Sequence, residues 1–192
     1  MEKSKITPPS KMLVIGGSAG SIEVILQVLP GLKKTLDFPI VIVLHRKSSA
    51  DSSLSDLFST RTELPVKEVD DKETISAGTI YLAPADYHLL FEKNNSFSLD
   101  FSEKVSYSRP SIDVSFESAS DIYGKNLRCL LLSGANSDGV EGLRVTKKNG
   151  GQIVVQDPET AEAPFMPQHA INKGNVDLVL KPQEMVAFIN GI

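Results

Sequence analysis

The sequence predicts an α/β fold with a doubly wound, mostly parallel sheet and one antiparallel β-hairpin excursion. Short runs rich in β-branched residues alternate with helical patterns, as in consecutive βαβ units. The run IVIVL at 40–44 has no polar alternation, which is typical of a strand covered on both faces. The turn signal Lys93-Asn94-Asn95-Ser96 lies between two strand-like runs and predicts the hairpin.

The individual elements follow from periodicity and from capping signals. Strands are expected at 11–15, 40–44, 79–83, 87–92, 97–101, 127–132, 153–156 and 176–180. Ser21 is the expected N-cap of a first helix that Pro30-Gly31 ends, and Ser111 is the expected cap of a helix running to about Tyr123. Further helices are expected at 52–58, 140–148, near 168–173 and at 182–189.

The composition is that of an ordinary globular domain. The chain has 192 residues, of which 41% are hydrophobic and 23% charged, and its net charge is −4. Lysine and arginine are scattered, so we expect no nucleic-acid partner, and the apolar runs are too short for membrane insertion. Residues 1–10 are interpreted as a flexible N-terminal leader and residues 11–192 as one catalytic domain, with a cytoplasmic location.

Three residues with complementary chemistry follow predicted parallel strands. Ser18 follows the first strand, His45 ends the second, and Asp138 lies in the loop after the strand LRCLLL. Ligands of open α/β sheets bind at the carboxyl ends of the strands, where these loops gather. A serine hydroxyl needs a neighbouring base, a histidine can take its proton, and a carboxylate can orient the imidazole. The sequence therefore predicts a Ser-His-Asp catalytic triad.

The glycine-rich turn around Ser18 supports this interpretation. The run GGSAG at 16–20 matches G-x-S-x-G between a strand and a helix, which is the context that the motif requires. Dinucleotide-binding domains also begin with such a turn, but the G-x-G-x-x-G spacing is absent and His45 replaces the expected acidic residue. The order Ser, His, Asp also differs from that of α/β-hydrolases.

Other polar residues have simpler explanations. His88 is expected to be a packed or hydrogen-bonded sheet residue, and His169 a residue on a helix surface. Three carboxylates could compete with Asp138 for the third position: Asp86, Asp113 and Asp157. The pattern contains no cluster with metal-ligand spacing, so neither a metal nor another cofactor is expected.

Six motifs, in order, resemble the catalytic domain of the CheB family, the chemotaxis protein-glutamate methylesterases. They are VIGGSAGSIEVILQVLP, IVIVLHRKSS, AGTIYLAPADYHLLF, RPSIDVSFESA, LLLSGANSDGVEGL and AEAPFMPQHAIN. The resemblance covers nearly everything from Met12 to about Leu180 and implies a Rossmann-like domain. It implies that Ser18 is the nucleophile, His45 the base and Asp138 its partner.

The same resemblance implies further site residues. Backbone N–H groups at Ala19 and Ala135 are expected to form the oxyanion hole, and Met166 is expected at the rim of the site. Family members often have a threonine after the nucleophile and a methionine in the aspartate loop, where this chain has Ala19 and Ala135. A hydroxyl group is lost at Ala19, whereas a backbone donor at Ala135 survives the replacement.

The resemblance also implies substrates and partners. The expected reaction is hydrolysis of glutamate γ-methyl esters on the cytoplasmic helices of methyl-accepting chemotaxis receptors, with deamidation of receptor glutamines by the same route. Many members carry an N-terminal receiver domain, for which ten residues leave no room. A separate regulator chain, constitutive activity and a fragment of a longer protein are the alternatives. A small-molecule esterase and a non-catalytic receptor-docking module are the competing functions.

Overall fold

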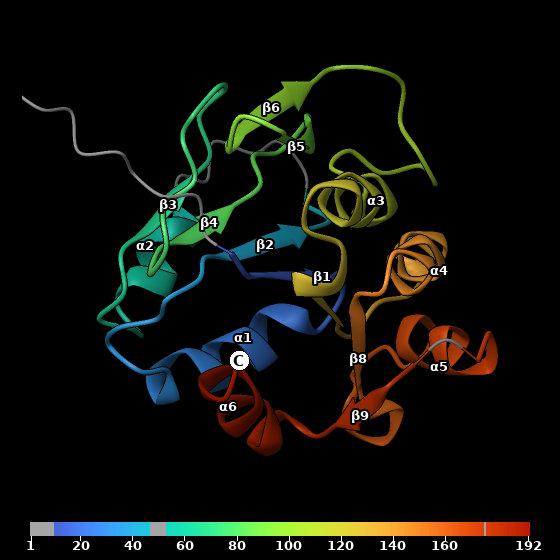
Figure 1. Ribbon diagram of the computed structural model, residues 1–192. Helices are drawn as coiled ribbons and strands as arrows, with labels where there is room; N and C mark the ends of the chain where they lie inside the picture. Colours follow the sequence, from blue (N-terminus) through green and yellow to red (C-terminus); the bar gives the residue numbers. More distant parts are fainter. Residues whose placement is uncertain (1–9, 47–52, 175) are drawn as a thin grey trace, which may run out of the picture.

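The fold is a three-layer α/β sandwich around a parallel sheet (Figure 1). The computed structural model describes residues 10–46, 53–174 and 176–192, so the predicted leader lies outside the described residues except for Ser10. The seven strands of the main sheet are β1 (Met12–Gly17), β2 (Ile40–Leu44), β3 (Val66–Glu68), β4 (Ile80–Leu82), β7 (Leu127–Leu131), β8 (Gln152–Gln156) and β9 (Leu178–Leu180). Every pairing between them is parallel, which confirms the predicted fold class.

The strand order places a topological switch point at β1. The order across the sheet is β3-β4-β2-β1-β7-β8-β9. The chain therefore builds outward from β1 through β2 on one side and then returns to start again with β7 on the other side. Loops that leave β1 and its two neighbours diverge at this point, which is where open α/β sheets bind their ligands.

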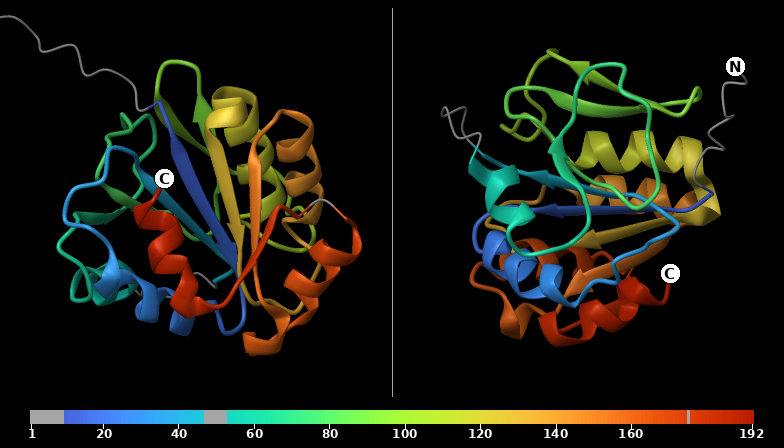
Figure 2. Two further views of the ribbon diagram at one scale, coloured as in Figure 1. Left: turned by 60° about the horizontal axis from the view of Figure 1, so that its bottom comes forward. Right: turned by 90° about the vertical axis from the view of Figure 1, so that its left-hand side faces the viewer.

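Helices cover both faces of the sheet (Figures 1 and 2). One face packs on α1 (Ser21–Val28) and α6 (Pro182–Asn190), and the other on α3 (Ile112–Tyr123), α4 (Val140–Lys148) and α5 (Phe165–Asn172). Successive residues of β1 alternate between the two apolar cores, with Met12 and Val14 in one and Leu13 and Ile15 in the other. Such two-sided burial explains why the strands read as continuous apolar runs.

The predicted hairpin is present as a separate two-stranded sheet. Strands β5 (His88–Glu92) and β6 (Ser96–Asp100) pair in antiparallel fashion around the expected turn. Asn95 adopts a positive φ of 62° in that turn, a conformation that asparagine tolerates. The hairpin packs against α3, where Ser118 Oγ accepts a hydrogen bond from Phe91 N at 2.8 Å.

Some details differ from the sequence-based expectations. The N-cap of α1 is Gly20, with a left-handed φ of 78°, and not Ser21, whose hydroxyl donates back to the Ser18 carbonyl. The short strand β3 and the 3₁₀ turns at 29–31, 124–126 and 158–160 were not expected. The remaining helix, α2 (Ser53–Ser59), agrees with its prediction except for Ser52, which lies outside the described residues. Among the described residues, no helix is long and apolar enough to cross a membrane.

Candidate active site

Backbone hydrogen bonds hold the carboxyl ends of β2, β1 and β7 together. His45 N donates to the Gly17 carbonyl at 3.2 Å, and Ser18 N donates to the Ser133 carbonyl at 2.9 Å. The pairing of the three strands therefore continues one step beyond their ends. As a result, the residues that follow β1 and β7 lie beside His45 at the end of β2.

The turn between β1 and α1 fixes the position of Ser18. The Ser18 carbonyl accepts from Ser21 N at 3.1 Å and from Ser21 Oγ at 2.5 Å. A Cβ at Gly20 would lie 2.5 Å from Glu162 Cβ, so the turn needs glycine for space as well as for its positive φ. Ser18 is half-buried in this turn and Ala19 is exposed.

His45 and Asp138 form a direct contact. His45 Nε2 lies 2.6 Å from Asp138 Oδ2, and the two side chains are 11% and 0% exposed. An ionised carboxylate only accepts hydrogen bonds, so Nε2 carries the ring proton and Nδ1 is left as the basic nitrogen. Two of the three predicted catalytic residues are thus brought together as the triad chemistry requires.

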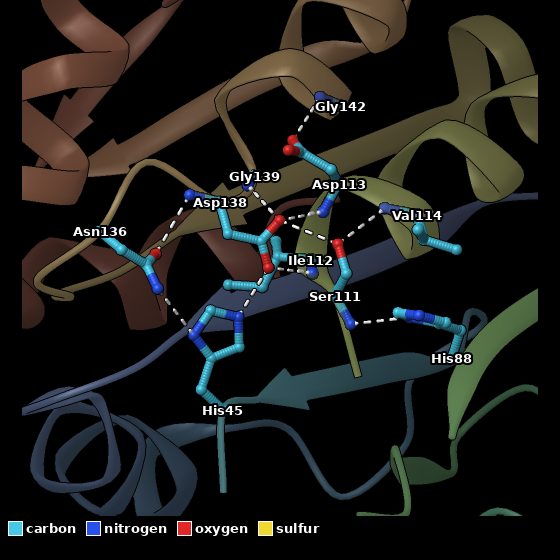
Figure 3. A network of polar contacts seen from close by, with 10 residues as sticks. All are labelled: His45, His88, Ser111, Ile112, Asp113, Val114, Asn136, Asp138, Gly139 and Gly142. Carbon is cyan, nitrogen blue, oxygen red and sulfur yellow. Dashed lines mark hydrogen bonds and ion pairs between the residues drawn. The ribbon is translucent and has the colours of Figure 1, made fainter. Parts of the chain in front are cut away.

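The N-terminus of α3 surrounds the Asp138 carboxylate with donors (Figure 3). Oδ2 accepts from Ile112 N at 2.7 Å, and Oδ1 accepts from Asp113 N at 3.0 Å, from Ser111 Oγ at 2.9 Å and from Gly139 N at 3.0 Å. Helix N-termini favour anions because their first N–H groups are unpaired and the helix dipole is positive there.

The same contacts set the ionisation of Asp138. Burial by itself raises the pKa of this carboxyl group, but the hydrogen bonds from His45, Asp113 N and Ile112 N outweigh it and lower the pKa below its usual value. Asp138 is therefore a stable anion that can hold the imidazole in one tautomer and support its positive charge.

Further polar residues hold this arrangement in place. Ser111 N donates to His88 Nδ1 at 3.1 Å, and His88 Nε2 donates to the Glu103 carbonyl at 2.9 Å. His88 is buried and hydrogen-bonded, as predicted for a sheet residue. Asn136 Oδ1 accepts from Asp138 N at 3.1 Å, and Asn136 Nδ2 lies 3.4 Å from His45 Nδ1 (Figure 3).

Ser18 lies at the next strand end without a hydrogen bond to this pair. Among the described residues, its hydroxyl group has no hydrogen-bond partner, and the contact near His45 Nδ1 is made by Asn136 instead. Catalytic hydrogen bonds are often long before substrate binds and then shorten. With Nε2 bound to Asp138, Nδ1 is the ring nitrogen that can accept a proton.

Two backbone donors near Ser18 are also unoccupied. Within the described part of the chain, neither Ala19 N nor Ala135 N donates a hydrogen bond, and both residues are exposed. The two loops are tied together by Ser133, whose Oγ donates to the Ala19 carbonyl at 2.6 Å and accepts from Ala163 N at 2.9 Å. Free N–H groups on two adjoining loops suit the stabilisation of an oxyanion.

The resemblance implies that Met166 lies at the rim of the site. In the structure, Met166 is instead buried against the aspartate loop. Its side chain is fully buried, and Met166 N donates to the Gly134 carbonyl at 2.9 Å. A Cβ at Gly134 would lie 2.7 Å from Met166 Sδ and 3.2 Å from Ser18 Cβ. Met166 thus supports the loop beside Ser18 from below, because glycine at 134 leaves room for its thioether group.

Two cavities are bordered by residues of the site. One, of about 550 Å³, is bordered by Ala135 and has a largely apolar wall made by Ala163, Pro164, Phe165, Gln168, His169 and Asn172. The other, of about 380 Å³, is bordered by His45 and is more polar; its other residues are Arg46, Asp86, Lys104, Tyr107, Ser108 and Arg109.

The competing residues are placed elsewhere or act differently. Asp157 accepts from Glu159 N at 3.0 Å in a turn after β8, and Asp86 lines the polar cavity. His169 stacks on Phe165 with ring centroids 5.5 Å apart, on the partly exposed surface of α5. Asp113 N donates to Asp138 Oδ1 at 3.0 Å, and among the described residues Asp113 forms no hydrogen bond with His45.

The sequence reasoning missed the supporting residues Asn136 and Ser133 and the contact of Ser111 with Asp138. The sequence indicates Ser111 only as a helix cap, which is confirmed, since its Oγ accepts from Val114 N at 3.4 Å. A capping serine followed by a helix N-terminus is the signal that could have pointed to a nearby anion. Which anion it meets depends on the packing of α3 beside the loop after β7.

Comparisons with known proteins identify the family and the fold of the chain. The family model for the CheB methylesterase matches residues 13–189. The crystal structure of the Thermotoga maritima CheB methylesterase catalytic domain superposes with a TM-score of 0.91 at 33% identity, covering 94% of this chain and 97% of that one.

Two further relatives match over nearly the whole of this chain. One from Leptospira interrogans is 45% identical over 173 residues, which are 90% of either chain. The protein-glutamate methylesterase/protein-glutamine glutaminase of Thermotoga maritima is 33% identical over 96% of this chain, but the match spans only 56% of that relative's length. With the fold and nearly the whole sequence matched, the chain belongs to the CheB methylesterase family.

Proposed function

We propose that the chain is a serine esterase that hydrolyses glutamate γ-methyl esters on chemotaxis receptors. The observation that carries this proposal is the 2.6 Å contact between His45 and a buried, ionised Asp138, next to the strand end that bears Ser18. A carboxylate-bound imidazole whose second nitrogen is unprotonated is the base that a serine nucleophile requires. Family membership supplies the substrate class.

In the proposed first step, Ser18 Oγ attacks the γ-ester carbon and transfers its proton to His45 Nδ1. Asp138 stabilises the imidazolium ion that forms. The ester carbonyl oxygen becomes an oxyanion, and Ala19 N and Ala135 N are the donors proposed to hold it. Collapse of the tetrahedral intermediate releases methanol, which takes the proton from His45 and leaves a glutamyl ester on Ser18.

In the second step, water attacks this ester. His45 removes a proton from the water molecule, and the same two N–H groups receive the second oxyanion. Ser18 leaves with the proton that His45 returns, and the product is a free glutamate side chain. A glutamine side chain reacts by the same route with ammonia as the leaving group, which gives the proposed deamidase activity.

The proposed partner is a receptor helix that presents the methylated glutamate. The largely apolar cavity is bordered by Ala135 and the more polar cavity by His45. An amphipathic helix has both kinds of surface, which makes it a suitable ligand for such a pair.

The test is methanol release from methylated receptor by the parent protein and by Ser18→Ala. We expect the substitution to lower kcat by roughly four to six orders of magnitude while receptor binding is retained. Ser55→Ala, a serine on α2, is the matched control and should retain activity. Equal methanol release by the parent protein and Ser18→Ala would refute the triad.

Two further measurements separate the competing functions. A panel of small esters distinguishes a small-molecule esterase, which would prefer them to methylated receptor. A fluorophosphonate probe distinguishes a docking module, because only an activated serine reacts with it. The proposal requires labelling of the parent protein that is lost in Ser18→Ala.

A further inference from the structure

The carboxylates of Asp113 and Asp138 cap each other's helices. Asp138 caps α3, which contains Asp113, and Asp113 caps α4, which Asp138 precedes. Asp138 lies just before α4, yet its carboxylate accepts from the N-terminal N–H groups of α3. Asp113 is the second residue of α3, and its Oδ1 accepts from Gly142 N, in the first turn of α4, at 2.7 Å. The two helices are thus joined by a reciprocal exchange of carboxylate caps, which depends on both side chains.

α3 approaches Gly142 so closely that there is no room for a side chain at this position. A Cβ there would lie 2.8 Å from the Asp113 carbonyl oxygen and 2.7 Å from Phe116 Cβ. The Asp113 carboxylate therefore reaches the backbone of α4 directly. Through this contact it fixes the start of α4 and the loop that carries Asp138.

Asp113 has no compensating cation. Within the described part of the chain, it forms no ion pair, and its side chain is partly buried between α3 and α4. Charged and titratable groups face this region from every packed element: Glu117 on α3, Glu141 and Arg144 on α4, Asp138 in the loop before α4, His45 at the end of β2 and His88 on β5. Arg144 is paired with Glu141 at 2.5 Å.

These surroundings place the ionisation of Asp113 near neutrality. Burial raises its pKa most, the Gly142 N–H lowers it, and the negative charge of Asp138 raises it again, to about 7. Asp138 keeps its charge across the same range because its pKa is lowered. The pair therefore changes from one negative charge to two as the pH passes through about 7.

We propose that Asp113 is a positioning residue that acts on His45 through Asp138, and that its ionisation strengthens catalysis. This inference rests on the proposed serine esterase function. A second negative charge behind Asp138 favours the imidazolium ion that forms as Ser18 attacks.

The test compares kcat against pH for the parent protein, Asp113→Asn and Asp113→Glu, with methylated receptor and with 4-nitrophenyl acetate as substrates. The amide keeps an oxygen that can accept from Gly142 N but carries no charge. Asp121→Asn, which removes a carboxylate two turns further along α3, is the matched control. Should Asp113→Asn fail to fold, Asp113→Ser replaces it as a neutral residue with an acceptor oxygen.

We expect the ratio of parent to Asp113→Asn kcat to be near one at about pH 5.5 and to rise to roughly three- to tenfold at about pH 8.5. Asp113→Glu should retain a pH-dependent ratio, and Asp121→Asn should match the parent throughout. A ratio for Asp113→Asn that is constant with pH overturns the proposal, because a purely structural cap acts equally at every pH.

The two substrates separate this inference from the proposed function. Hydrolysis of the nitrophenyl ester without hydrolysis of methylated receptor contradicts the receptor function, yet the pH-dependent ratio still tests Asp113. If the parent protein hydrolyses neither substrate, the role of Asp113 is also overturned, because there is no activated serine for it to support.

Discussion

His45 faces Asp138 with its Nε2 atom, at 2.6 Å from Oδ2. In the serine-protease triad the carboxylate instead binds Nδ1, and Nε2 faces the serine. The roles of the two ring nitrogens are therefore exchanged here. This follows from the origin of the side chains: His45 lies at the end of β2, and the carboxylate comes from beyond β1, in the loop after β7.

The first prediction concerns Asp138→Asn. All five contacts of the Asp138 carboxylate come from donors, three to Oδ1 and two to Oδ2. An amide group cannot satisfy them in either orientation, because its NH₂ group would face another N–H or O–H. We expect kcat to fall by about 10⁴-fold and the free energy of unfolding by about 3 kcal/mol.

Methanol release and denaturant unfolding measure these two effects. Asp157→Asn is the matched control, since Asp157 also follows a strand of the sheet but only caps a turn. It should retain parental kcat. An Asp138→Asn protein with parental kcat would exclude the carboxylate from the mechanism.

The strand ends could be predicted from the sequence, but the surroundings of Asp138 could not. Ser18 and His45 follow directly after apolar runs, so their position at the sheet edge depends only on local pattern. Asp138 lies seven residues beyond β7, and three other aspartates could compete with it for the third position. Its selection depends on how α3 packs, because the N-terminus of that helix supplies the hydrogen bonds that hold the anion.

Boundary errors have a similar origin. Ser21 has the side chain of a good N-cap, yet Gly20 takes that position because the turn after β1 requires a positive φ of 78°. Ser21 then uses its hydroxyl group to hold the Ser18 carbonyl. The tertiary requirement of placing Ser18 overrides the local capping preference.

The second prediction concerns stability against pH. The pKa of Asp113 is raised to about 7, above the value of about 3.9 in an unfolded chain. Its contribution to stability is therefore fully present below about pH 3.9 and is lost as the pH rises through about 7. The pKa of Asp138 is lowered, so its contribution is present above about pH 3.9 and is lost as the pH falls below that value.

Asp113→Asn should therefore stabilise the protein at pH 8 by on the order of 2 kcal/mol, with little gain near pH 4. Denaturant unfolding of the parent protein and the variant at both pH values measures this difference. Equal stabilisation at both values would contradict the raised pKa. Combined with lower kcat at pH 8, this result would mean that the charge on Asp113 serves activity at the expense of stability.

The third prediction concerns Ser111→Ala. Ser111 Oγ accepts from Val114 N as the cap of α3 and donates to Asp138 Oδ1. We expect the substitution to lower the free energy of unfolding by about 1–2 kcal/mol and kcat by roughly tenfold. Ser118→Ala, on the same helix, removes hydrogen bonds to Phe91 and should cost stability without lowering the kcat of the folded protein.

Unfolding curves and kcat at a temperature where both variants are folded distinguish the two. If Ser111→Ala and Ser118→Ala have the same kcat, the hydrogen bond from Ser111 to Asp138 has no part in catalysis.

The fourth prediction concerns the contact between Gly134 and Met166. A methyl group at Gly134 would lie 2.5 Å from Met166 Cε and 3.2 Å from Ser18 Cβ, so Gly134→Ala should displace the thioether group and the Ser18 turn. We expect kcat to fall by roughly tenfold and the protein to lose about 1–3 kcal/mol of stability.

Met166→Ala alone should also destabilise the protein, by about 2–4 kcal/mol, through the cavity that it leaves. The double variant should recover part of both losses, because the added methyl group occupies the space that the shortened side chain vacates. A double-mutant cycle in unfolding free energy and in kcat measures this coupling, and strictly additive effects would mean that Met166 does not set the position of the loop beside Ser18.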